Sequence, residues 1–223
     1  MVTLEHIGKR YGAGPEVLHD VSLALEPGEF RFLLGASGSG KTTLLKIICL
    51  AELPSHGALR LFGADAGTLD RAERAALRRR IGIVLQEFRF IDRLTVGDNV
   101  ALPLRIADLP EAEIGERVAA LLRWFELEQK VDALPSELCG SGKQRVAIAR
   151  AIVTRPDLLI ADEPTRHADA ETADLLVRVF ERLNRLGTTV LIATHDIGFA
   201  RGFEHRCAEL EGGSLRSIGA FAL

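Results

Sequence analysis

A glycine-rich stretch between two apolar runs most constrains what this chain can fold into. Residues 30–34, Phe-Arg-Phe-Leu-Leu, are typical of a buried strand, and residues 44–48, Leu-Leu-Lys-Ile-Ile, are typical of the first turns of a helix. Between them, Gly35-x-x-x-x-Gly40-Lys41-Thr42 has the spacing of a phosphate-binding loop, which joins a strand to a helix. The stretch therefore predicts an α/β fold that holds a phosphate chain at this turn.

Each residue type in this loop has a chemical reason to be there. Glycines allow backbone N–H groups to approach phosphate oxygens closely, and the helix that begins near Lys41 directs its positive end at the same anion. We expect Lys41 to reach the β- and γ-phosphates and the Thr42 hydroxyl to ligate Mg²⁺. The residues predicted to bind the nucleotide are Gly35, Ala36, Ser37, Gly38, Ser39, Gly40, Lys41, Thr42 and Thr43.

Composition excludes several classes of protein. The net charge of the 223-residue chain is −3, so its bulk charge gives no attraction to nucleic acid or to anionic lipid. The three cysteines stand far apart without C-x-x-C spacing, which argues for reduced thiols in a cytosolic setting and against a disulfide framework or zinc site. We expect no signal peptide and no membrane span of its own, so work at a membrane would need a partner.

Two carboxylates follow a second apolar run. Residues 157–161 are predicted to form a buried strand, which ends at Asp162 and Glu163. We expect Asp162 to hold Mg²⁺, directly or through its water shell, and Glu163 to orient or deprotonate the attacking water. Adjacent acids are also common at strand ends without any catalytic role, so the phosphate-binding loop upstream is what favours this interpretation.

Two further polar residues end predicted strands. Gln86 follows residues 81–85, where a neutral amide can touch Mg²⁺ or the attacking water. His195 follows residues 188–193, where it can hydrogen-bond the γ-phosphate. The remaining histidines considered, His6, His19, His56 and His205, are expected to be surface or turn residues.

Aromatic residues allow two interpretations each. Tyr11, the only tyrosine, follows a predicted strand over residues 2–7 and either stacks on an adenine ring or is an ordinary surface aromatic. Trp124 lies beside the apolar stripe of a helix predicted over residues 110–125 and is expected to be a packing residue. Other short strands, such as residues 21–25, predict a small antiparallel sheet at the edge of the core, and a helix is predicted over residues 143–154.

The order of these motifs resembles the nucleotide-binding domain of ABC ATPases across nearly the whole chain. Residues 35–43 are similar to Walker A, Gln86 to the Q-loop, 138–145 to the signature, 162–163 to Walker B, 164–169 to the D-loop and His195 to the switch histidine. The resemblance implies a P-loop NTPase with a RecA-like core, an edge antiparallel β-subdomain and an inserted α-helical subdomain (87–156), in a single domain over residues 1–223. It further implies ATP and Mg²⁺ as cofactors and an adenine-stacking role for Tyr11.

Within that family, the stretches 8–11, 44–49, 94–104 and 193–197 are most similar to the FtsE group of cell-division ATP-binding subunits. That similarity implies a homodimer, peripheral on the cytoplasmic face of the cell membrane and bound to the membrane protein FtsX. There, ATP-driven closure would control cell-wall hydrolases, and Phe88, Phe90 and Ile91 would lie where the family grips its membrane partner. Lipoprotein-release and macrolide-efflux ATPases share most of these motifs and stay as alternatives.

Two loops depart from the family pattern. The signature L-S-G-G-x-Q-x-R reads Leu-Cys-Gly-Ser-Gly-Lys-Gln-Arg here, so Cys139 replaces serine and Ser141 replaces glycine, where a side chain is expected to hinder close approach or a positive φ. The D-loop P-T-G-N-L-D reads Pro-Thr-Arg-His-Ala-Asp. In the family dimer both loops face the ATP of the other subunit, which implies nucleotide contacts for Cys139, Gly140, Ser141 and Asp169. An ATP-binding scaffold with little turnover is therefore a further alternative.

Overall fold

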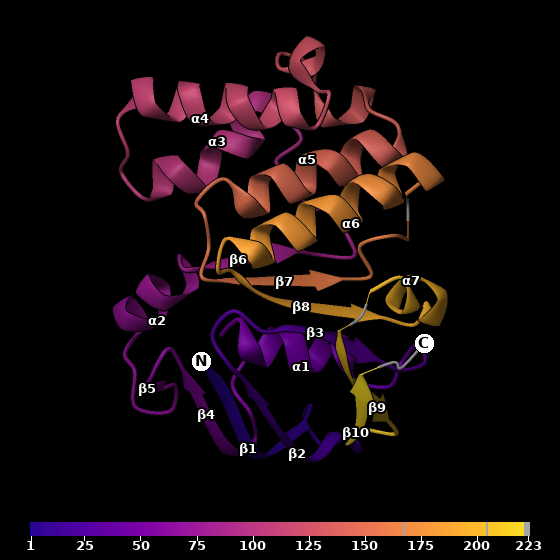
Figure 1. Cartoon of the computed structure of the whole chain (residues 1–223). Helices are drawn as coiled ribbons and strands as arrows, with labels where there is room; N and C mark the ends of the chain where they lie inside the picture. Colours follow the sequence, from indigo (N-terminus) through magenta and orange to yellow (C-terminus); the bar gives the residue numbers. More distant parts are fainter. Residues whose placement is uncertain (167, 204, 221–223) are drawn as a thin grey trace. The chain divides into compact units, whose positions relative to one another are not determined.

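The computed structural model describes residues 1–166, 168–203 and 205–220 (Figure 1). It divides into two compact units. The first is formed by Met1–Arg78 together with the chain from Asn184 onward, and the second by residues 79–183. Both units combine strands and helices, as the predicted α/β class requires.

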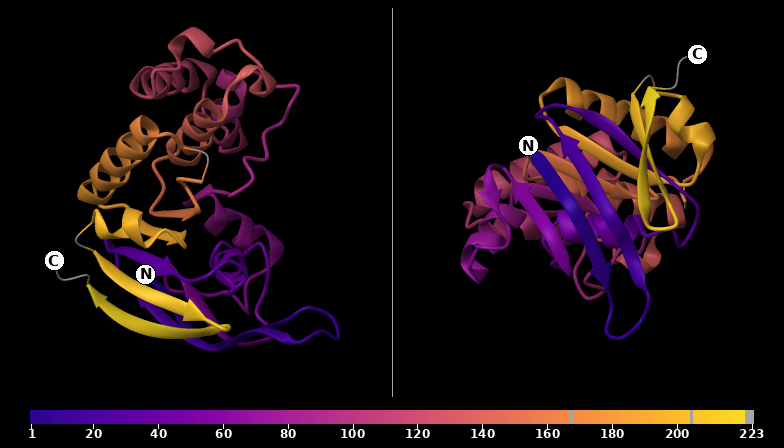
Figure 2. Two further views of the ribbon diagram at one scale, coloured as in Figure 1. Left: turned by 90° about the vertical axis from the view of Figure 1, so that its right-hand side faces the viewer. Right: turned by 90° about the horizontal axis from the view of Figure 1, so that it is seen from below.

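An antiparallel sheet in the first unit has the strand order β2-β1-β4-β5 and confirms the predicted edge sheet. The sequence predicted only the regularly alternating parts of its first two strands. The pairing continues past them through irregular register, with His6 in a left-handed conformation, and Figure 2 shows the two strands side by side. The four strands are β1 (Val2–Arg10), β2 (Glu16–Leu25), β4 (His56–Leu61) and β5 (Ala64–Asp65).

Parallel strands carry the predicted phosphate-binding loop in the same unit. Strand β3 (Phe30–Leu34) pairs in parallel with both β8 (Thr189–Thr194) and β9 (Arg206–Glu211), and β10 (Ser214–Ala220) pairs antiparallel with β9. All residues of β8 are buried, as expected for a strand covered on both faces. Helices α1 (Lys41–Ile48), α2 (Arg71–Arg78) and α7 (Ile197–Arg201) complete the unit.

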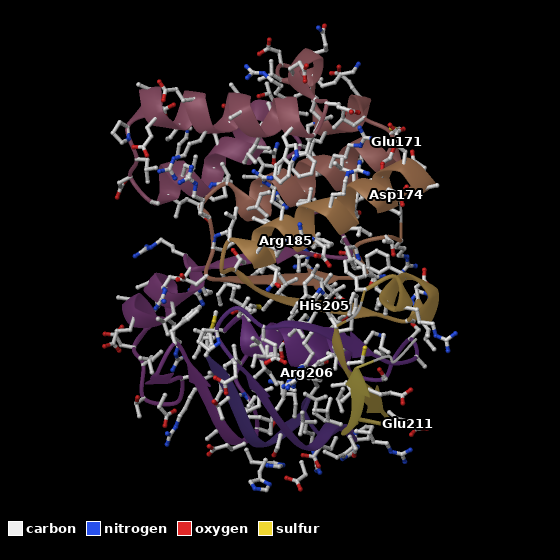
Figure 3. All side chains as sticks on the ribbon, viewed as in Figure 1. Glu171, Asp174, Arg185, His205, Arg206 and Glu211 are labelled. Atoms are coloured by element: carbon white, nitrogen blue, oxygen red, sulfur yellow. The ribbon has the colours of Figure 1, made fainter. Side chains whose placement is uncertain are left out.

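An aromatic cluster next to β3 corrects one expectation. The ring of His205, which is labelled in Figure 3, stacks on that of Phe30, with centroids 4.1 Å apart and an angle of 10° between the planes. Phe203 lies 5.3 Å from Phe30 and is buried. His205 is therefore a half-buried packing residue, because an imidazole ring is flat enough to extend an aromatic stack, and not the ordinary surface residue that was expected.

The second unit places helices around a parallel pair of strands. Strand β6 (Ile81–Val84) lies parallel to β7 (Leu158–Asp162), with Ile81 opposite Leu158. A Cβ atom on Gly82 would lie 2.3 Å from the carbonyl oxygen of Ala151, so the strand backbone packs directly on a helix. The helices are α3 (Val96–Ile106), α4 (Glu111–Trp124), α5 (Gly140–Ile152) and α6 (Ala170–Arg185), with short 3₁₀ turns η1 (Glu128–Lys130) and η2 (Pro135–Glu137).

Four of the helices end in the same way. Two residues past the end of α1, α3 and α4, and three residues past the end of α5, the chain has a residue with a positive φ between 54° and 57°, and none of the four is glycine. After α4, for example, the N–H of Leu127 donates to the carbonyl of Leu122 at 2.7 Å, which satisfies a carbonyl that the helix leaves open. The four residues in this left-handed conformation are Leu50, Asp108, Glu126 and Arg155.

Candidate nucleotide-binding site

The loop between β3 and α1 requires glycine at two positions. Gly35 has a φ of +155° and Gly40 a φ of +104°, which side chains rarely adopt. A Cβ atom on Gly35 would lie 2.4 Å from the carbonyl oxygen of Leu210, and one on Gly40 would lie 2.9 Å from a methyl group of Leu18. The loop is thus a bare backbone turn, which a phosphate chain can approach closely.

Lys41 brings a positive charge to this loop. Lys41 is the first residue of α1, and it is only 6% exposed. The ammonium donates to the carbonyl oxygens of Gly35 at 2.7 Å and Ala36 at 3.0 Å. The N-cap of α1 is Gly40, which has no side chain to occupy the first N–H groups of the helix, and such groups favour an anion.

Hydroxyl groups and a ring flank the loop. The Oγ atom of Ser39 is buried and has no hydrogen-bond partner among the described residues, which suits a donor to a bound phosphate. Tyr11 is 43% exposed, and its hydroxyl donates to Oγ1 of Thr43 at 3.5 Å. The ammonium of Lys9 lies 5.0 Å from the centre of the Tyr11 ring. Tyr11 therefore lies beside the loop with an exposed ring available for stacking.

The register of β3 and β8 sets the position of His195. Leu34 pairs with Thr194 in these parallel strands, so Gly35 and His195 leave the sheet at the same edge. His195 is exposed, and the next residue, Asp196, accepts a backbone N–H of α7 at 2.9 Å. The first unit therefore brings the predicted histidine to the edge that carries the glycine-rich loop.

In the second unit, the two carboxylates and the amide lie at or just past the ends of β6 and β7. Asp162 ends the buried strand β7 and is 3% exposed, and Glu163 follows with a φ of +48°, which turns the chain sharply. Val84 pairs with Ala161, so β6 and β7 end together. Gln86 therefore leaves the same edge of the second unit as Asp162 and Glu163.

The start of α5 differs from the prediction. The helix begins at Gly140 and not at Lys143, because Cys139 acts as its N-cap and accepts the N–H of Gly142 at 3.4 Å. Ser141 lies in the first turn and is not among the residues with positive φ. The expectation that Ser141 conflicts with a positive φ was therefore wrong, since a serine fits this helical backbone without strain.

The thiol of Cys139 is exposed and chemically perturbed. Its Sγ atom lies 3.2 Å from Oγ of Ser141, and this hydrogen bond is the main cause that lowers the pKa of the Cys139 thiol. The N–H of Gly142 lowers that pKa further. A thiol at a helix N-terminus with these donors ionises more readily than an ordinary cysteine.

Asp169 in the D-loop has a structural contact of its own. Its carboxylate accepts the N–H of Thr172 at 2.8 Å, which caps α6 and lowers the pKa of Asp169, with a further contribution from the Ser141 hydroxyl. The hydroxyl of buried Thr172 accepts a hydrogen bond from Nε of Arg145 at 3.3 Å. This contact connects the signature helix with α6, while residue 167 of the D-loop lies outside the described residues.

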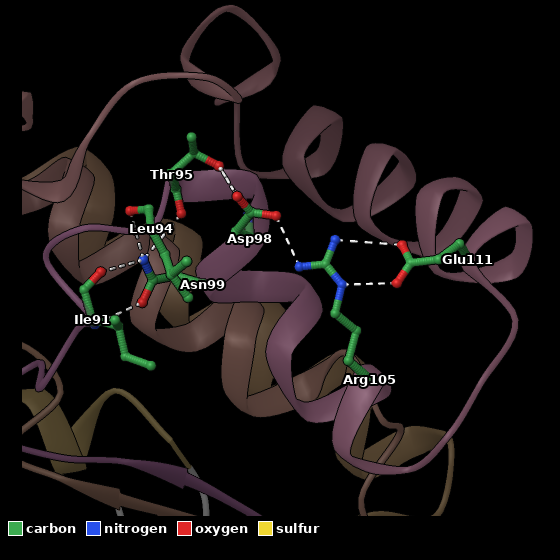
Figure 4. Close-up of polar contacts among 7 residues, drawn as sticks. All are labelled: Ile91, Leu94, Thr95, Asp98, Asn99, Arg105 and Glu111. Carbon is green, nitrogen blue, oxygen red and sulfur yellow. Dashed lines mark hydrogen bonds and ion pairs between the residues drawn. The ribbon is translucent and has the colours of Figure 1, made fainter.

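A buried amide that the sequence analysis missed supports the segment after Gln86. Asn99 is fully buried, and its side chain accepts the N–H of Ile91 at 3.0 Å (Figure 4). Its amide nitrogen lies 3.2 Å from the carbonyl oxygen of Ile91 and 3.0 Å from those of Leu94 and Thr95. The only signal in the sequence was a polar residue inside the apolar run of α3.

Arg150, which the sequence analysis also missed, holds the predicted coupling segment. It donates to the backbone carbonyls of Phe88 and Arg89, the latter at 3.0 Å, and its guanidinium lies 5.0 Å from the ring centre of Phe90. The rings of Phe88 and Phe90 stack with centroids 5.6 Å apart. The apolar segment is thus an ordered, half-buried loop.

The chemistry of the donors fits a magnesium nucleotide. In the second unit Gln86 and Asp162 offer amide and carboxylate oxygens, and in the first unit Thr42 offers a hydroxyl oxygen. Each of these is a ligand type that Mg²⁺ prefers. No helix in the described ranges is long and apolar enough to cross a membrane.

The family model described as ABC transporter matches residues 18–166. The chain is 43% identical to the cell division ATP-binding protein FtsE of Escherichia coli K12, over 96% of this chain and 97% of that protein. It is 41% identical to FtsE of Mycobacterium tuberculosis, over 96% of this chain and 94% of that protein. It is also 41% identical to the methionine import ATP-binding protein MetN of Xylella fastidiosa, over 98% of this chain and 67% of that protein.

Solved structures give the same fold at full length. A dimeric post-hydrolysis state of an ATP-binding cassette bound to ADP and Pi superposes with a TM-score of 0.93 and 35% identity, covering 100% of both chains. A dimeric bacterial ABC transporter cassette superposes with a TM-score of 0.93 and 34% identity, again over 100% of both chains.

Proposed function

Because this chain belongs to the ABC transporter family of ATPases, we propose that it is the ATP-hydrolysing subunit of an FtsE-type complex in cell division. The match to FtsE of Escherichia coli over nearly the whole of both proteins carries this proposal. MetN is nearly as similar in sequence, but its match covers only 67% of that protein.

The proposal assigns a role to each residue of the nucleotide site. The glycine-rich loop and Lys41 bind the phosphates of ATP, and Tyr11 stacks on the adenine. Thr42, Asp162 and Gln86 hold Mg²⁺, which neutralises phosphate charge when it is bound. Glu163 accepts a proton from the attacking water, and His195 hydrogen-bonds the γ-phosphate. The contacts of Lys41 with Gly35 and Ala36 support this assignment, since they fix its charge at the loop.

We propose further that two copies of the chain close on ATP. The similar cassettes are described as dimers, one of them bound to ADP and Pi. In such a dimer Cys139, Gly140 and Ser141 at the N-terminus of α5, together with Asp169, would face the nucleotide of the other copy. Support comes from the N-terminus of α5 itself, where backbone N–H groups and the helix dipole favour an anion.

The proposed partner is a membrane protein of the FtsX type, which would hold the dimer on the inner face of the cell membrane. Closure of the dimer would then be transmitted to control cell-wall hydrolysis and would move no solute. The ordered apolar loop around Phe88 and Phe90 supports a partner contact at this place, because stacked aromatics at the surface are typical of protein interfaces.

Co-purification tests the partner. The tagged full chain, isolated with Mg-ATP from detergent-solubilised membranes of its own organism, should retain an FtsX-type protein as the main membrane component. The same preparation should hydrolyse ATP. Recovery of a methionine-import, lipoprotein-release or macrolide-efflux permease in its place would overturn the division assignment. A nucleotide-bound complex without turnover would favour the scaffold alternative, which the altered signature residues Cys139 and Ser141 suggest.

A further inference from the structure

A groove of about 700 Å³ opens on the second unit, lined by α4, the end of α5 and α6. None of its lining residues belongs to the motifs assigned to the nucleotide or to the loop after Gln86. Its size falls within the range of ligand and peptide pockets. The groove is therefore a feature of the surface that ATP binding does not explain.

An exposed tryptophan forms one wall of this groove. Trp124 is the only tryptophan of the chain and was expected to be a packing residue, and its side chain is 38% exposed. Its ring lies 5.6 Å from that of Phe125, which is fully buried, so the indole is anchored from one side. One turn earlier on α4, Ala120 leaves room beside the indole. Tryptophan in such a position is the residue type most enriched in binding hot spots.

Cationic side chains flank the apolar part of the groove. Arg155 and Arg182 are exposed, and neither forms an ion pair or a side-chain hydrogen bond with another residue in the described part of the chain. A third arginine, Arg117, is already paired with Glu113. The positive charges of Arg155 and Arg182 therefore lie in the same groove as the indole of Trp124, on a chain whose net charge is −3. This combination complements an acidic ligand with an apolar side chain.

We propose that this groove binds a short acidic amphipathic segment of a partner protein. An apolar side chain of the segment packs on Trp124 and Ala120, and its carboxylates pair with Arg155 and Arg182. A protein segment fits better than an anionic bilayer, because the surface is hollowed. Binding in this groove does not depend on which membrane protein is the partner of the ATPase.

Trp124 makes the proposal directly measurable, since its fluorescence is the only tryptophan signal of the chain. The probe is a tryptophan-free synthetic peptide of about twelve residues, with leucine and phenylalanine at helical spacing and glutamate on the flanks. Titrated into the full chain at low salt, it should give a saturable change in Trp124 emission. A matched peptide with glutamine in place of glutamate should bind about tenfold more weakly, as should the acidic peptide at high salt.

Variants that remove single positive charges test whether the peptide binds in this groove. Arg155→Gln and Arg182→Gln should each weaken the peptide about threefold, and the double variant about tenfold, the scale of exposed ion pairs. Arg123→Gln is the matched control, because Arg123 is exposed on α4 but does not line the groove, and it should bind as the wild type does. ATP hydrolysis should be the same in the wild type and in all four variants, which would show that each variant is folded.

Several results would overturn the proposal. One is the absence of a saturable change in Trp124 emission with the acidic peptide. Another is equal affinity for the glutamine peptide, which would show that the arginines do not recognise the carboxylates. A double variant that binds the peptide normally would place it elsewhere. A response of Trp124 to phosphatidylglycerol vesicles that the double variant loses, without a response to the peptide, would assign the surface to a membrane.

Discussion

The Sγ atom of Cys139 lies 3.2 Å from Oγ of Ser141 at the N-terminus of α5. These are the two residues that depart from the family signature, and the structure brings them into contact with each other. The same Sγ atom accepts the N–H of Gly142, so the thiol is occupied by two contacts within its own turn. A sulfur atom is a weaker and longer partner than the hydroxyl that serine would offer.

The first prediction follows from that contact. Cys139→Ser, combined with Ser141→Gly, should raise kcat for ATP at least severalfold, because a hydroxyl donor to a charged phosphate contributes about 1.5–3 kcal/mol and a weak thiol donor supplies only part of that. ATP affinity of the monomer should hardly change, since its own glycine-rich loop binds the nucleotide. Steady-state hydrolysis at saturating Mg-ATP and equal dimer concentration provides the measurement.

The single variants show which of the two residues limits kcat. Ser141 already has an ordinary helical backbone, so Ser141→Gly alone should give little gain, whereas Cys139→Ser alone should give most of it. Equal rates for the wild type and the double variant would show that the loop is already competent, and the scaffold alternative would lose its main support.

The second prediction concerns pH. The hydrogen bond from Ser141 lowers the pKa of the Cys139 thiol, so thiolate forms at a lower pH than for an ordinary cysteine. A thiolate cannot donate and repels phosphate, so hydrolysis by the wild type should fall relative to Cys139→Ser as pH rises from about 7 to 9. The ratio of the two pH–rate profiles measures this effect, and profiles that stay parallel would contradict it.

Local signals predicted the elements around the phosphate-binding loop correctly. Strand β3 has the predicted bounds, and α1 begins at Lys41 as expected. Both were predictable because the apolar run 30–34 ends at Gly35 and the glycine-rich loop ends at Gly40. The edges that carry His195 and Gln86 were also predictable, since each residue follows a buried strand.

Three other features could not be predicted in the same way. The early start of α5 depends on a cysteine acting as N-cap, which residue preferences do not favour. The amide of Asn99 became visible only once four backbone groups around it were placed. Trp124 was expected to be a packing residue, but its partial exposure could not be predicted, because periodicity identifies the apolar stripe of a helix and not how far the edge of that stripe is covered.

The third prediction tests the loop itself. Gly35→Ala should abolish measurable ATP binding, because the new Cβ atom would lie 2.4 Å from a carbonyl oxygen and the backbone φ is +155°. Gly63→Ala is the matched control: φ is +88° there, but the Cβ atom would meet nothing within 4 Å. The control should lose about 1 kcal/mol of stability and keep its ATP affinity. Titration with a fluorescent ATP analogue, together with urea unfolding, distinguishes loss of binding from loss of fold.

The fourth prediction concerns the loop that Arg150 holds. Phe88→Ala with Phe90→Ala should weaken recruitment to membranes and spare ATP binding by the isolated chain, because these stacked rings are only half-buried. Membrane fractionation of cells that produce the variant measures recruitment.

Two comparisons interpret that result. Ile106→Ala removes an exposed apolar side chain from the end of α3, outside this loop, and should leave recruitment unchanged. Normal recruitment of the folded double variant would place the partner surface elsewhere, whereas failure to fold would mean that both rings are core residues.

The fifth prediction concerns Glu163, which follows the buried strand β7 at a sharp turn with φ of +48°. Glu163→Gln keeps the size of the side chain but removes its basicity, so hydrolysis should fall by roughly 10²-fold or more while ATP binding persists. ATP that is bound and not cleaved should then hold two copies together, and size-exclusion chromatography with Mg-ATP should show a dimer. Asp174→Asn removes an exposed acid from α6 and should leave hydrolysis unchanged (Figure 3). A Glu163→Gln variant that hydrolyses normally would transfer the role of base to another group, and one that stays monomeric at every concentration would count against closure of two copies on ATP.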